Sequence, residues 1–334
     1  MTDKLMKVVL EADFSGRILI RNNEKTLFDY SGGFADRTMK KLIGRDTLFG
    51  IASGTKFLTA LALGKLIEEH KISLDTKAFS IFDPGKVSYD KEITLRQLLN
   101  HTSGMPDYLD ESLFPDMDNI ELTISNDRLI SPKDYLPLFP DTPMVHTPGE
   151  RFIYNNGAFV YLAIIIEELS GMSYKDYINH QLMKPLGIER SGVYSFAELP
   201  SDCAIGYIQD GKNWISNISK LPYQAGGDGG AWMSAEDMCV IWKSFLNGRI
   251  LSSKLTEEFL TPYIIANKER EIYYGLGLWL QKIKEAYLPY IVGSDAGISF
   301  KSSYNSATNG YKFAVSNTSE GLFEIINEIN QVEV

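Results

Sequence analysis

Cysteine, histidine and positive charge are all scarce in this sequence. Two cysteines and four histidines among 334 residues are too few for a disulfide framework or a cysteine-based zinc site, and the histidines lack the spacing of a helical zinc motif. Lys and Arg number 33 against 43 Asp and Glu, which gives a net charge of −10. An acidic chain without a basic run disfavours binding to the phosphates of nucleic acid. We therefore expect no metal, no cofactor and no nucleic-acid partner.

Long apolar runs and a leader segment are absent as well. The longest apolar run, residues 158–166, has 9 residues, whereas a helix that spans a membrane needs about 20. Residues 1–16 show no apolar core followed by small residues, as a signal peptide would. We expect no membrane span and a cytoplasmic location, or secretion if a leader precedes this sequence. The sequence carries no signal for an oligomeric state.

What is present is the composition of a globular protein, with 44% apolar and 23% charged residues. We predict an α+β fold in which strands from both chain ends form one antiparallel sheet, flanked by helices, with a mainly helical central region. A single domain, 1–334, would comprise a sheet part at 12–52 and 220–334 and a helical part at 53–219. Periodicity predicts strands at 17–21, 26–30 and through 278–315, helices at 56–69, 95–99, 158–169, 234–246 and 321–329, and an irregular, proline-rich loop at 103–151.

The most informative segment is Phe49–Lys56, which places Ser53 at the start of an apolar helix and Lys56 three residues later. Residues i and i+3 share a helix face, so the amine can lie beside the hydroxyl. A serine hydroxyl is a poor nucleophile without a neighbouring base, and a lysine desolvated near a helix N-terminus can lose its proton near neutral pH. Alternatively, Ser53 caps the helix and Lys56 is exposed.

A second segment, Thr147–Gly157, places Tyr154 and Asn156 two residues apart, after a Pro–Gly turn and before an apolar helix. In extended chain such residues point the same way. A phenol near an ammonium has a depressed pKa and can shuttle protons, and the amide can hydrogen-bond both the lysine and a substrate carbonyl. The same spacing recurs at Tyr177 and Asn179, where we expect packing within a helix.

Ser53-Gly54-Thr55-Lys56 and Tyr154-Asn155-Asn156 resemble the first two motifs of the serine β-lactamase and penicillin-binding-protein superfamily. Other segments are similar to its class C β-lactamase-like branch, which includes DD-peptidases, esterases and D-amino-acid peptidases. On their combined order along the chain, the sequence is identified as a member of this superfamily. These supporting segments are Asp46–Phe49, Leu95–Gly104, Lys184–Ile188, Gly230–Met238 and Tyr274–Gly277.

The resemblance implies a single catalytic domain and a role for each matching residue. Ser53 would be the acylated nucleophile, Lys56 and Tyr154 would share general-base and general-acid work, and Asn156 would hold Lys56 and the substrate amide. The backbone amide of Ser53 would supply one oxyanion donor and an amide on an edge strand the other, each worth about 3 kcal/mol of the barrier. The segment His101–Gly104 is expected to be a hydrogen-bonded structural loop.

The third motif departs from the family, which usually carries Lys or His, then Thr or Ser, then Gly on that edge strand. If Phe300 matches the family's usual Phe, Gly293 replaces the cation, Asp295 replaces the small residue and Ala296 is the oxyanion donor. Ser294, Asp295 and Ala296 would then bind the substrate. A lost cation and a gained carboxylate disfavour a substrate carboxylate, tolerate a neutral ester or amide, and favour a cationic amine. Alternatively, the register is off by one or two residues and Asp295 turns outward to a hydrogen bond in a tight turn.

We therefore expect a serine hydrolase that forms an acyl-enzyme at Ser53 and acts on a small-molecule or peptide-like amide or ester, as a D-amino-acid peptidase, carboxypeptidase or esterase does. One alternative is a catalytically weak penicillin-binding or regulatory member, which the altered third motif supports. A true β-lactamase is the other, and the missing cation disfavours it. The glycine-rich run 226–230 lacks nucleotide-binding spacing and is expected to pack near the pocket, where glycine lets backbone approach a ligand.

Overall fold

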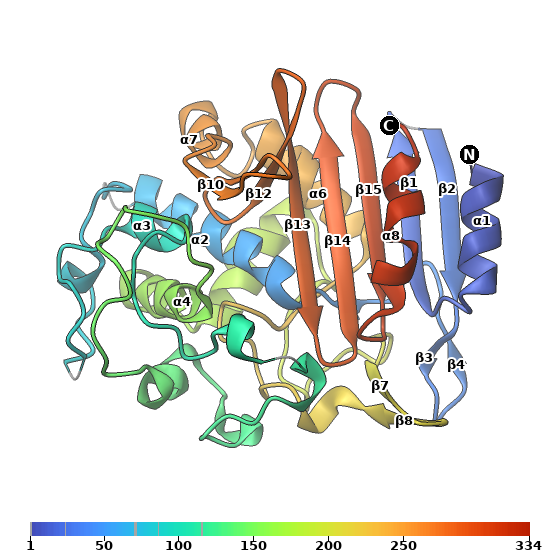
Figure 1. Cartoon of the computed structure of the whole chain (residues 1–334), viewed down its shortest axis with the longest axis horizontal. Coiled ribbons are helices and arrows are strands. Elements are labelled where there is room, and N and C mark those ends of the chain that lie inside the picture. Colours follow the sequence, from blue (N-terminus) through green and yellow to red (C-terminus); the bar gives the residue numbers. More distant parts are fainter. Residues whose placement is uncertain (1, 24, 70–71, 86, 115) are drawn as a thin grey trace.

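The computed structural model describes residues 2–334 except 24, 70, 71, 86 and 115. Its largest element is an antiparallel sheet of eight strands, to which both ends of the chain contribute (Figure 1). In their order along the sheet the strands are β10 (Ile264–Asn267), β11 (Ile272–Tyr274), β12 (Trp279–Ile283), β13 (Ala286–Asp295), β14 (Ile298–Asn305), β15 (Gly310–Ser316), β1 (Gly16–Asn22) and β2 (Lys25–Gly32). The predicted α+β architecture, with one sheet built from both chain ends, is therefore confirmed.

The N-terminal hairpin shows how the sequence builds both faces of this sheet. Leu19 packs into the large core with the central helices, whereas Ile18 and Ile20 pack into a second cluster, since successive side chains of a strand point to opposite faces. That second cluster holds buried residues of α1 (Thr2–Glu11) and α8 (Gly321–Gln331). The hairpin and α8 were predicted from the sequence, and α1 was not.

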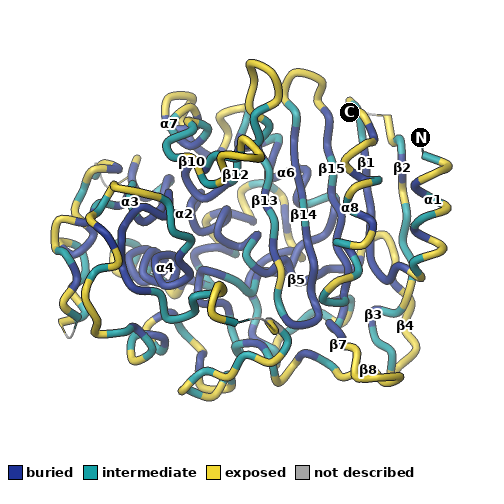
Figure 2. The backbone as a smooth tube through the Cα atoms, viewed as in Figure 1, coloured by how far each residue is buried: buried dark blue, intermediate teal, exposed yellow. Residues whose placement is uncertain are grey.

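The other face of the sheet packs on helices that are apolar on nearly all sides. α2 (Thr55–Glu69) and α4 (Asn156–Ser170) contact each other, and Figure 2 shows α4 and the central strands deep in the buried interior. α4 ends at Gly171, whose φ of +68° favours glycine. The remaining helices are α3 (Leu95–Leu99), α5 (Tyr174–Asp176), the π-helix η7 (Tyr177–Met183) that follows it, the 3-10 turn η8 (Lys184–Leu186), α6 (Ala235–Leu246) and α7 (Ser253–Phe259).

Short strands and 3-10 turns fill the rest of the chain. The small sheets are β5 (Phe49–Gly50) with β9 (Ala231–Met233) and β6 (Gly192–Val193), β3 (Phe34–Asp36) with β4 (Lys41–Leu42), and β7 (Tyr207–Asp210) with β8 (Asn213–Ser216). The region 53–219 is therefore not purely helical. Between α3 and α4, the described part of 103–151 is irregular chain with the 3-10 turns η3 (Glu111–Leu113), η4 (Met117–Asn119), η5 (Asn126–Arg128) and η6 (Pro132–Leu138), as its prolines predicted.

Within the described residues, no single helix is both long and apolar enough to cross a membrane. α4 and the helical segment Tyr174–Leu186 pass that test only as a pair, and they are bent by 80° at the break between them. In this fold every residue of α4 from Asn156 to Ile166 is buried by the rest of the chain.

Candidate active site

The turn that carries Ser53 has a strained backbone that hydrogen bonds of the Thr55 side chain hold in place. The chain leaves β5, passes through one 3-10 turn, η1 (Ala52–Gly54), and enters α2. Ala52 has a φ of +46°, a left-handed conformation that costs a residue with a side chain about 1–2 kcal/mol. Thr55 Oγ1 donates to the Ala52 carbonyl (2.7 Å) and accepts from the Ala231 amide (3.0 Å). These bonds hold the strained turn and place Ser53 at the N-terminal end of α2.

Lys56, in the first turn of α2, is only 2% exposed. Its Nζ lies 2.9 Å from Ser53 Oγ, 2.7 Å from Asn156 Oδ1 and 2.8 Å from the Asp228 carbonyl oxygen. Burial lowers the pKa of Lys56, and the Asp228 carboxylate opposes this shift. A neutral amine has two hydrogens and one lone pair, and the two carbonyl oxygens accept those hydrogens. The lone pair then faces Ser53 and can take its proton, as a general base must.

Tyr154 reaches Ser53 from the loop that precedes α4. Its hydroxyl is hydrogen-bonded to the Ser53 side chain, and Lys56 Nζ is 4.9 Å from the centre of its ring. Burial and the nearby Glu111 carboxylate raise the pKa of Tyr154 well above its ordinary value, and the Ser53 hydrogen bond offsets only part of that shift. The expectation of a depressed phenol pKa is therefore wrong. The phenol is therefore protonated at neutral pH and can act as a hydrogen-bond donor.

Asn156 opens α4 and accepts a hydrogen bond from Lys56 through its Oδ1. Its Nδ2 donates to the Leu109 carbonyl (2.9 Å) and to Glu111 Oε1 (3.0 Å). Both amide hydrogens are thus bound by the loop that begins η3, and they are not free for a substrate. The Asn156 side chain thus orients Lys56, and its role in holding the substrate amide stays a prediction.

β13 carries the third motif next to Ser53. Its residues match the family's pattern two positions earlier in the sequence than expected, with the cation position at Ile291 and not at Gly293. A Cβ on Gly293 would lie 2.3 Å from the Ile51 carbonyl oxygen and 2.9 Å from Ser53 N, so this position has no room for the family's Lys or His. Gly293 is the motif's glycine, packed against the nucleophile turn. Ile291, which is buried, and Val292 take the places of the cation and the hydroxyl residue. The motif therefore lacks its cation in either register.

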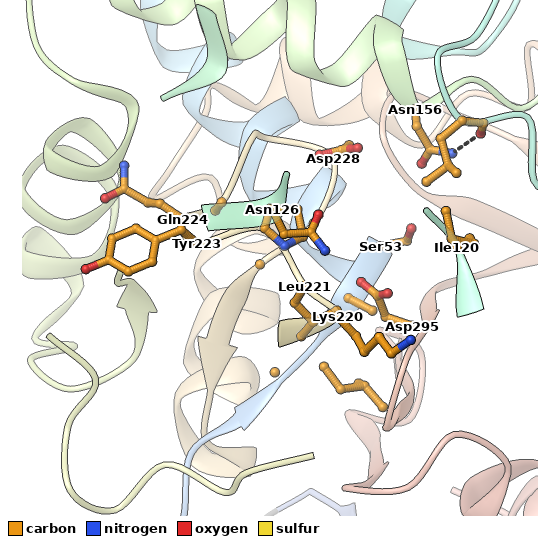
Figure 3. Close-up of a pocket in the computed structure, with 18 of the residues that line it drawn as sticks. Ser53, Ile120, Asn126, Asn156, Lys220, Leu221, Tyr223, Gln224, Asp228 and Asp295 are labelled. Atoms are coloured by element: carbon orange, nitrogen blue, oxygen red, sulfur yellow. Dashed lines mark hydrogen bonds between the residues drawn. The ribbon is translucent and has the colours of Figure 1, made fainter. Parts of the chain in front are cut away.

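Asp295 and Ala296 form the tip of the β13–β14 hairpin. The Ala296 amide donates to Asp295 Oδ1 (2.9 Å), and the Ala296 carbonyl accepts from Asn217 Nδ2 (2.8 Å). Because its amide is already bound, the oxyanion role expected for Ala296 is wrong. Asp295 borders the cavity beside Ser53 (Figure 3). Burial raises the pKa of Asp295 to about 7, with a smaller contribution from the Asp228 carboxylate.

Ser294 is the next candidate for the oxyanion role that was expected of Ala296. It follows Gly293 directly and borders the cavities on both sides of Ser53. Ser294 pairs with Ser299 of β14, one step from the pair that closes the two-residue turn. Antiparallel pairs alternate between bonded and unbonded, and the pair that closes such a turn is bonded. The Ser294 amide therefore faces away from β14, toward the side of the strand on which the nucleophile turn lies.

Two cavities meet at the nucleophile, and Ser53, Glu111 and Ser294 line both. The one drawn in Figure 3 holds the Glu111, Asp228 and Asp295 carboxylates, with Lys220 also on its wall. The other cavity has an apolar wall, formed by Met105, Val145, Ile153, Tyr154, Val292 and Trp279, and an acidic wall, formed by Asp107 and Asp110. Both sides of the nucleophile are therefore more acidic than basic.

Asp228 and Glu111 belong to the site but were not among the predicted residues. Asp228 is 8% exposed and its Oδ2 accepts from the Tyr108 hydroxyl (2.6 Å). The sequence did place the glycine run around Asp228 near the pocket, which was the only signal for it. The second Tyr-x-Asn copy packs as expected, because Asn179 hydrogen-bonds both backbone groups of Val193.

The described part of the chain contains no group of three or more His, Cys, Asp or Glu placed to bind a metal ion. His70 lies outside the described residues.

Replacing Asp295 by asparagine is expected to stabilise the protein at pH 8 and to leave its stability unchanged below about pH 4. The carboxyl has a pKa of about 7 in the folded protein and about 3.9 in an unfolded chain. Between these values the folded state binds more protons, so stability falls as the pH rises. Asparagine removes that loss, which is on the order of 2 kcal/mol at pH 8 after allowance for partial exposure.

Urea unfolding of both proteins at pH 4, 6 and 8 measures this effect. Asp210→Asn, on the exposed β7–β8 hairpin, is the control and should change nothing. The same pH dependence in Asp295→Asn and the unaltered protein would contradict the burial of this carboxylate.

A buried amine and a phenol that both contact one hydroxyl at a helix N-terminus, beside the edge of an antiparallel sheet, define a protein of the serine hydrolase superfamily. The beta-lactamase family matches residues 11–315, and the chain belongs to that family. The sequence-based recognition is thus confirmed.

Individual relatives support this assignment over most of the chain. Penicillin-binding protein 4* of Bacillus subtilis (strain 168) is 30% identical over 284 residues, 81% of this chain and 61% of that protein. Teichoic acid D-alanine hydrolase of Staphylococcus aureus is 26% identical over 272 residues, 81% of this chain and 64% of that protein. The chain thus spans less than two thirds of the length of these curated relatives. The crystal structure of a penicillin binding protein from Bacillus halodurans is 34% identical, covers 98% of this chain and 99% of its own, and has a TM-score of 0.91.

Proposed function

We propose that this protein is a serine hydrolase that forms an acyl-enzyme at Ser53 and acts on a peptide-like amide or ester. The observation that carries the proposal is the 2.9 Å contact between Lys56 Nζ and Ser53 Oγ in a site where two carbonyl oxygens already take the other hydrogens of the amine. An amine held in this way has its lone pair directed at the hydroxyl. The usual weakness of serine as a nucleophile is thereby removed.

In acylation, Ser53 Oγ attacks the substrate carbonyl carbon while its proton passes to Lys56 Nζ. The oxyanion that develops is stabilised by the backbone amides of Ser53 and Ser294. The bond to the leaving amine or alcohol then breaks, and Tyr154 donates a proton to the leaving group and regains one from Lys56. Water attacks the ester in the second half-reaction, and the same groups return the proton to Ser53.

The charges around Ser53 favour a substrate that is neutral or cationic near the scissile bond. Three carboxylates border the cavity of Figure 3, and Ile291 and Val292 leave the third motif without the cation that would pair with a substrate carboxylate. A D-amino-acid ester or amide with a free amino group meets this requirement. The name of the Staphylococcus aureus relative, a teichoic acid D-alanine hydrolase, is consistent with such a substrate, and D-amino-acid peptidase and esterase activities both belong to this proposal.

The second candidate function is that of a penicillin-binding protein that is acylated slowly, which the name of the Bacillus subtilis relative favours, or that of a true β-lactamase. The missing cation of the third motif argues against efficient use of β-lactams, because their carboxylate would face Glu111, Asp228 and Asp295 with Lys220 as the one cation among the described residues that line this cavity. A cytoplasmic or secreted location is compatible with either function.

The test is the intact mass of the protein after exposure to a fluorophosphonate, with Ser53→Ala as the matched variant. We expect one adduct on the unaltered protein and none on Ser53→Ala. No adduct on the unaltered protein, or the same adduct on the variant, would refute the acyl-enzyme proposal. Turnover of nitrocefin is expected to be far slower than that of a p-nitrophenyl ester, and comparable turnover would favour the β-lactamase instead.

A further inference from the structure

We infer that His101 and Asp107 are positioning residues that hold Tyr154 and Asn156 in register with Ser53 and Lys56. Their two side chains bind three successive backbone amides, those of Asn155, Asn156 and Gly157, and we call this pair the amide clamp. The inference rests on the proposed function, because it concerns the rate at which Ser53 is acylated. The sequence suggested only a structural loop for the His101–Gly104 segment.

The His101 half of the clamp acts on the residue between the two site residues. His101 is 0% exposed, and its Nδ1 accepts a hydrogen bond from the Asn155 amide (3.1 Å). Its own carbonyl accepts from the Ile153 amide (3.0 Å). The ring centre of His101 lies 4.4 Å from that of Tyr154. His101 therefore binds the backbone on both sides of Tyr154, at Ile153 and Asn155, and its ring packs against the Tyr154 ring.

The hydrogen bond to Asn155 also fixes the state of the imidazole. Because Nδ1 is the acceptor, the ring is neutral and its proton is on Nε2. Nε2 is buried and has no hydrogen-bond partner among the described residues, since the ring packs against the aromatic rings of Tyr154, Phe159 and Tyr274. Burial, aided by the Lys56 charge, lowers the pKa of His101 well below its ordinary value. The acceptor is therefore present throughout the neutral pH range.

The Asp107 half of the clamp acts on the first turn of α4. Asp107 Oδ2 accepts from the Asn156 amide (2.6 Å) and Oδ1 from the Gly157 amide (2.8 Å). The Asn155 side chain completes the arrangement, with its Nδ2 donating to the Met105 carbonyl (2.7 Å). Burial raises the pKa of Asp107 to about 7, and the hydrogen bonds from the Asn156 and Gly157 amides oppose this shift. The segment 101–107 is therefore tied to the start of α4 at every residue from 155 to 157.

Hydrogen bonds of this kind satisfy the free backbone amides at any helix N-terminus. Here they also fix the position of Tyr154 relative to Ser53. No regular strand or helix contains residues 150–155, so the approach of Tyr154 to Ser53 depends on side chains that bind its backbone. His101 adopts a φ of +58°, a left-handed conformation that is costly for a residue with a side chain. A displacement of about 1 Å at a reacting group can slow a reaction about 100-fold. The amide clamp prevents that displacement.

The experiment measures the inactivation of full-length variants by a fluorophosphonate, with the maximal rate constant kinact separated from the inhibitor constant KI. In His101→Ala the acceptor is lost, and we expect kinact to fall about 10–100-fold while KI changes by less than about 3-fold. In His101→Asn the Oδ1 takes the place of Nδ1 and asparagine tolerates a positive φ, so kinact should stay within about 3-fold of the unaltered protein.

Phe152→Leu is the matched control. Phe152 packs on the His101 ring at 5.7 Å between centres, so its loss weakens the same region without removing an amide acceptor. We expect Phe152→Leu to lower the thermal midpoint but not kinact. If His101→Ala fails to fold, Asp107→Asn decides the question, because it replaces one of the two carboxylate acceptors by an NH2 group.

Three results would overturn the inference while leaving the proposed function intact, provided that the unaltered protein is labelled. They are an unchanged kinact in folded His101→Ala, a His101→Asn as slow as His101→Ala, and, where His101→Ala does not fold, an unchanged kinact in Asp107→Asn. Failure of the unaltered protein to be labelled would refute the proposed function itself. A merely structural role for the clamp predicts lower stability with the same kinact in the folded protein.

Discussion

Lys56→Met is expected to slow the acylation of Ser53 by about 10²–10⁴-fold, the range that a positioned general base contributes. Methionine has nearly the length of lysine and no proton to donate or accept. The variant therefore keeps the packing of a side chain that is 2% exposed and loses only the amine. Stopped-flow measurement of the p-nitrophenol burst with a p-nitrophenyl ester gives the acylation rate constant directly.

Stability separates this effect from unfolding. A buried amine is costly in its charged form, so its replacement by an apolar group of similar size removes that cost. The same replacement leaves Asn156 Oδ1 and the Asp228 carbonyl without their donor, which costs about 1–3 kcal/mol. These effects oppose one another, and we expect a folded protein of nearly unchanged stability.

Lys65→Met on the same helix is the control for this prediction. Among the residues that the structure describes, Lys65 forms an i, i+4 ion pair with Glu69 at 3.7 Å, and such a partly exposed pair is worth little. Its variant should acylate at the rate of the unaltered protein. If Lys56→Met also kept that rate, Lys56 could not be the base, and the phenol of Tyr154 would have to be deprotonated despite its raised pKa.

Local spacing explains why so much of the site was visible in the sequence. Ser53 and Lys56 are three residues apart on one helix, so the geometry of that helix alone brings their polar atoms together. Tyr154 and Asn156 come just before and at the first residue of a long apolar helix whose burial the sequence also showed. The strands at 17–21 and 26–30 are rich in residues typical of strands, and the turn-like residues between them predict a hairpin. All of these features depend on residues that are close to one another in the sequence.

The features that sequence analysis missed depend on distant neighbours. The register of the third motif is set by the contact of Gly293 with the Ile51 carbonyl, 242 residues away along the chain, and no local pattern encodes that contact. The direction of the Tyr154 pKa shift was wrong because burial and Glu111 outweigh the amine, and burial is a property of the folded protein. Asp228 was hidden among glycines, of which Gly227 lies so close to α4 that an added Cβ would be 2.8 Å from the Phe159 carbonyl oxygen.

Gly293→Ala is expected to lower the rate of acylation about 100-fold or more, although the change adds a single methyl group. That methyl would lie 2.3 Å from the Ile51 carbonyl oxygen and 2.9 Å from Ser53 N. Both are backbone atoms, so no side chain can rotate to make room, and either the nucleophile turn or the edge of β13 must move. A shift of about 1 Å between the Ser53 and Ser294 amides separates the two oxyanion donors, and the loss of one donor alone costs about 10²–10³-fold.

The control is Gly44→Ala, where the nearest atom to an added Cβ is Thr47 Oγ1 at 3.9 Å, an ordinary contact. Gly44→Ala lowers the backbone entropy of the unfolded chain as Gly293→Ala does, but it causes no clash, so this variant should acylate normally. In Gly293→Ala we expect the acylation rate constant to fall more than the affinity for substrate, because the oxyanion exists only after attack has begun. Normal acylation by a folded Gly293→Ala protein would show that β13 and the nucleophile turn are not in contact, and Ser294 could not then be the second donor.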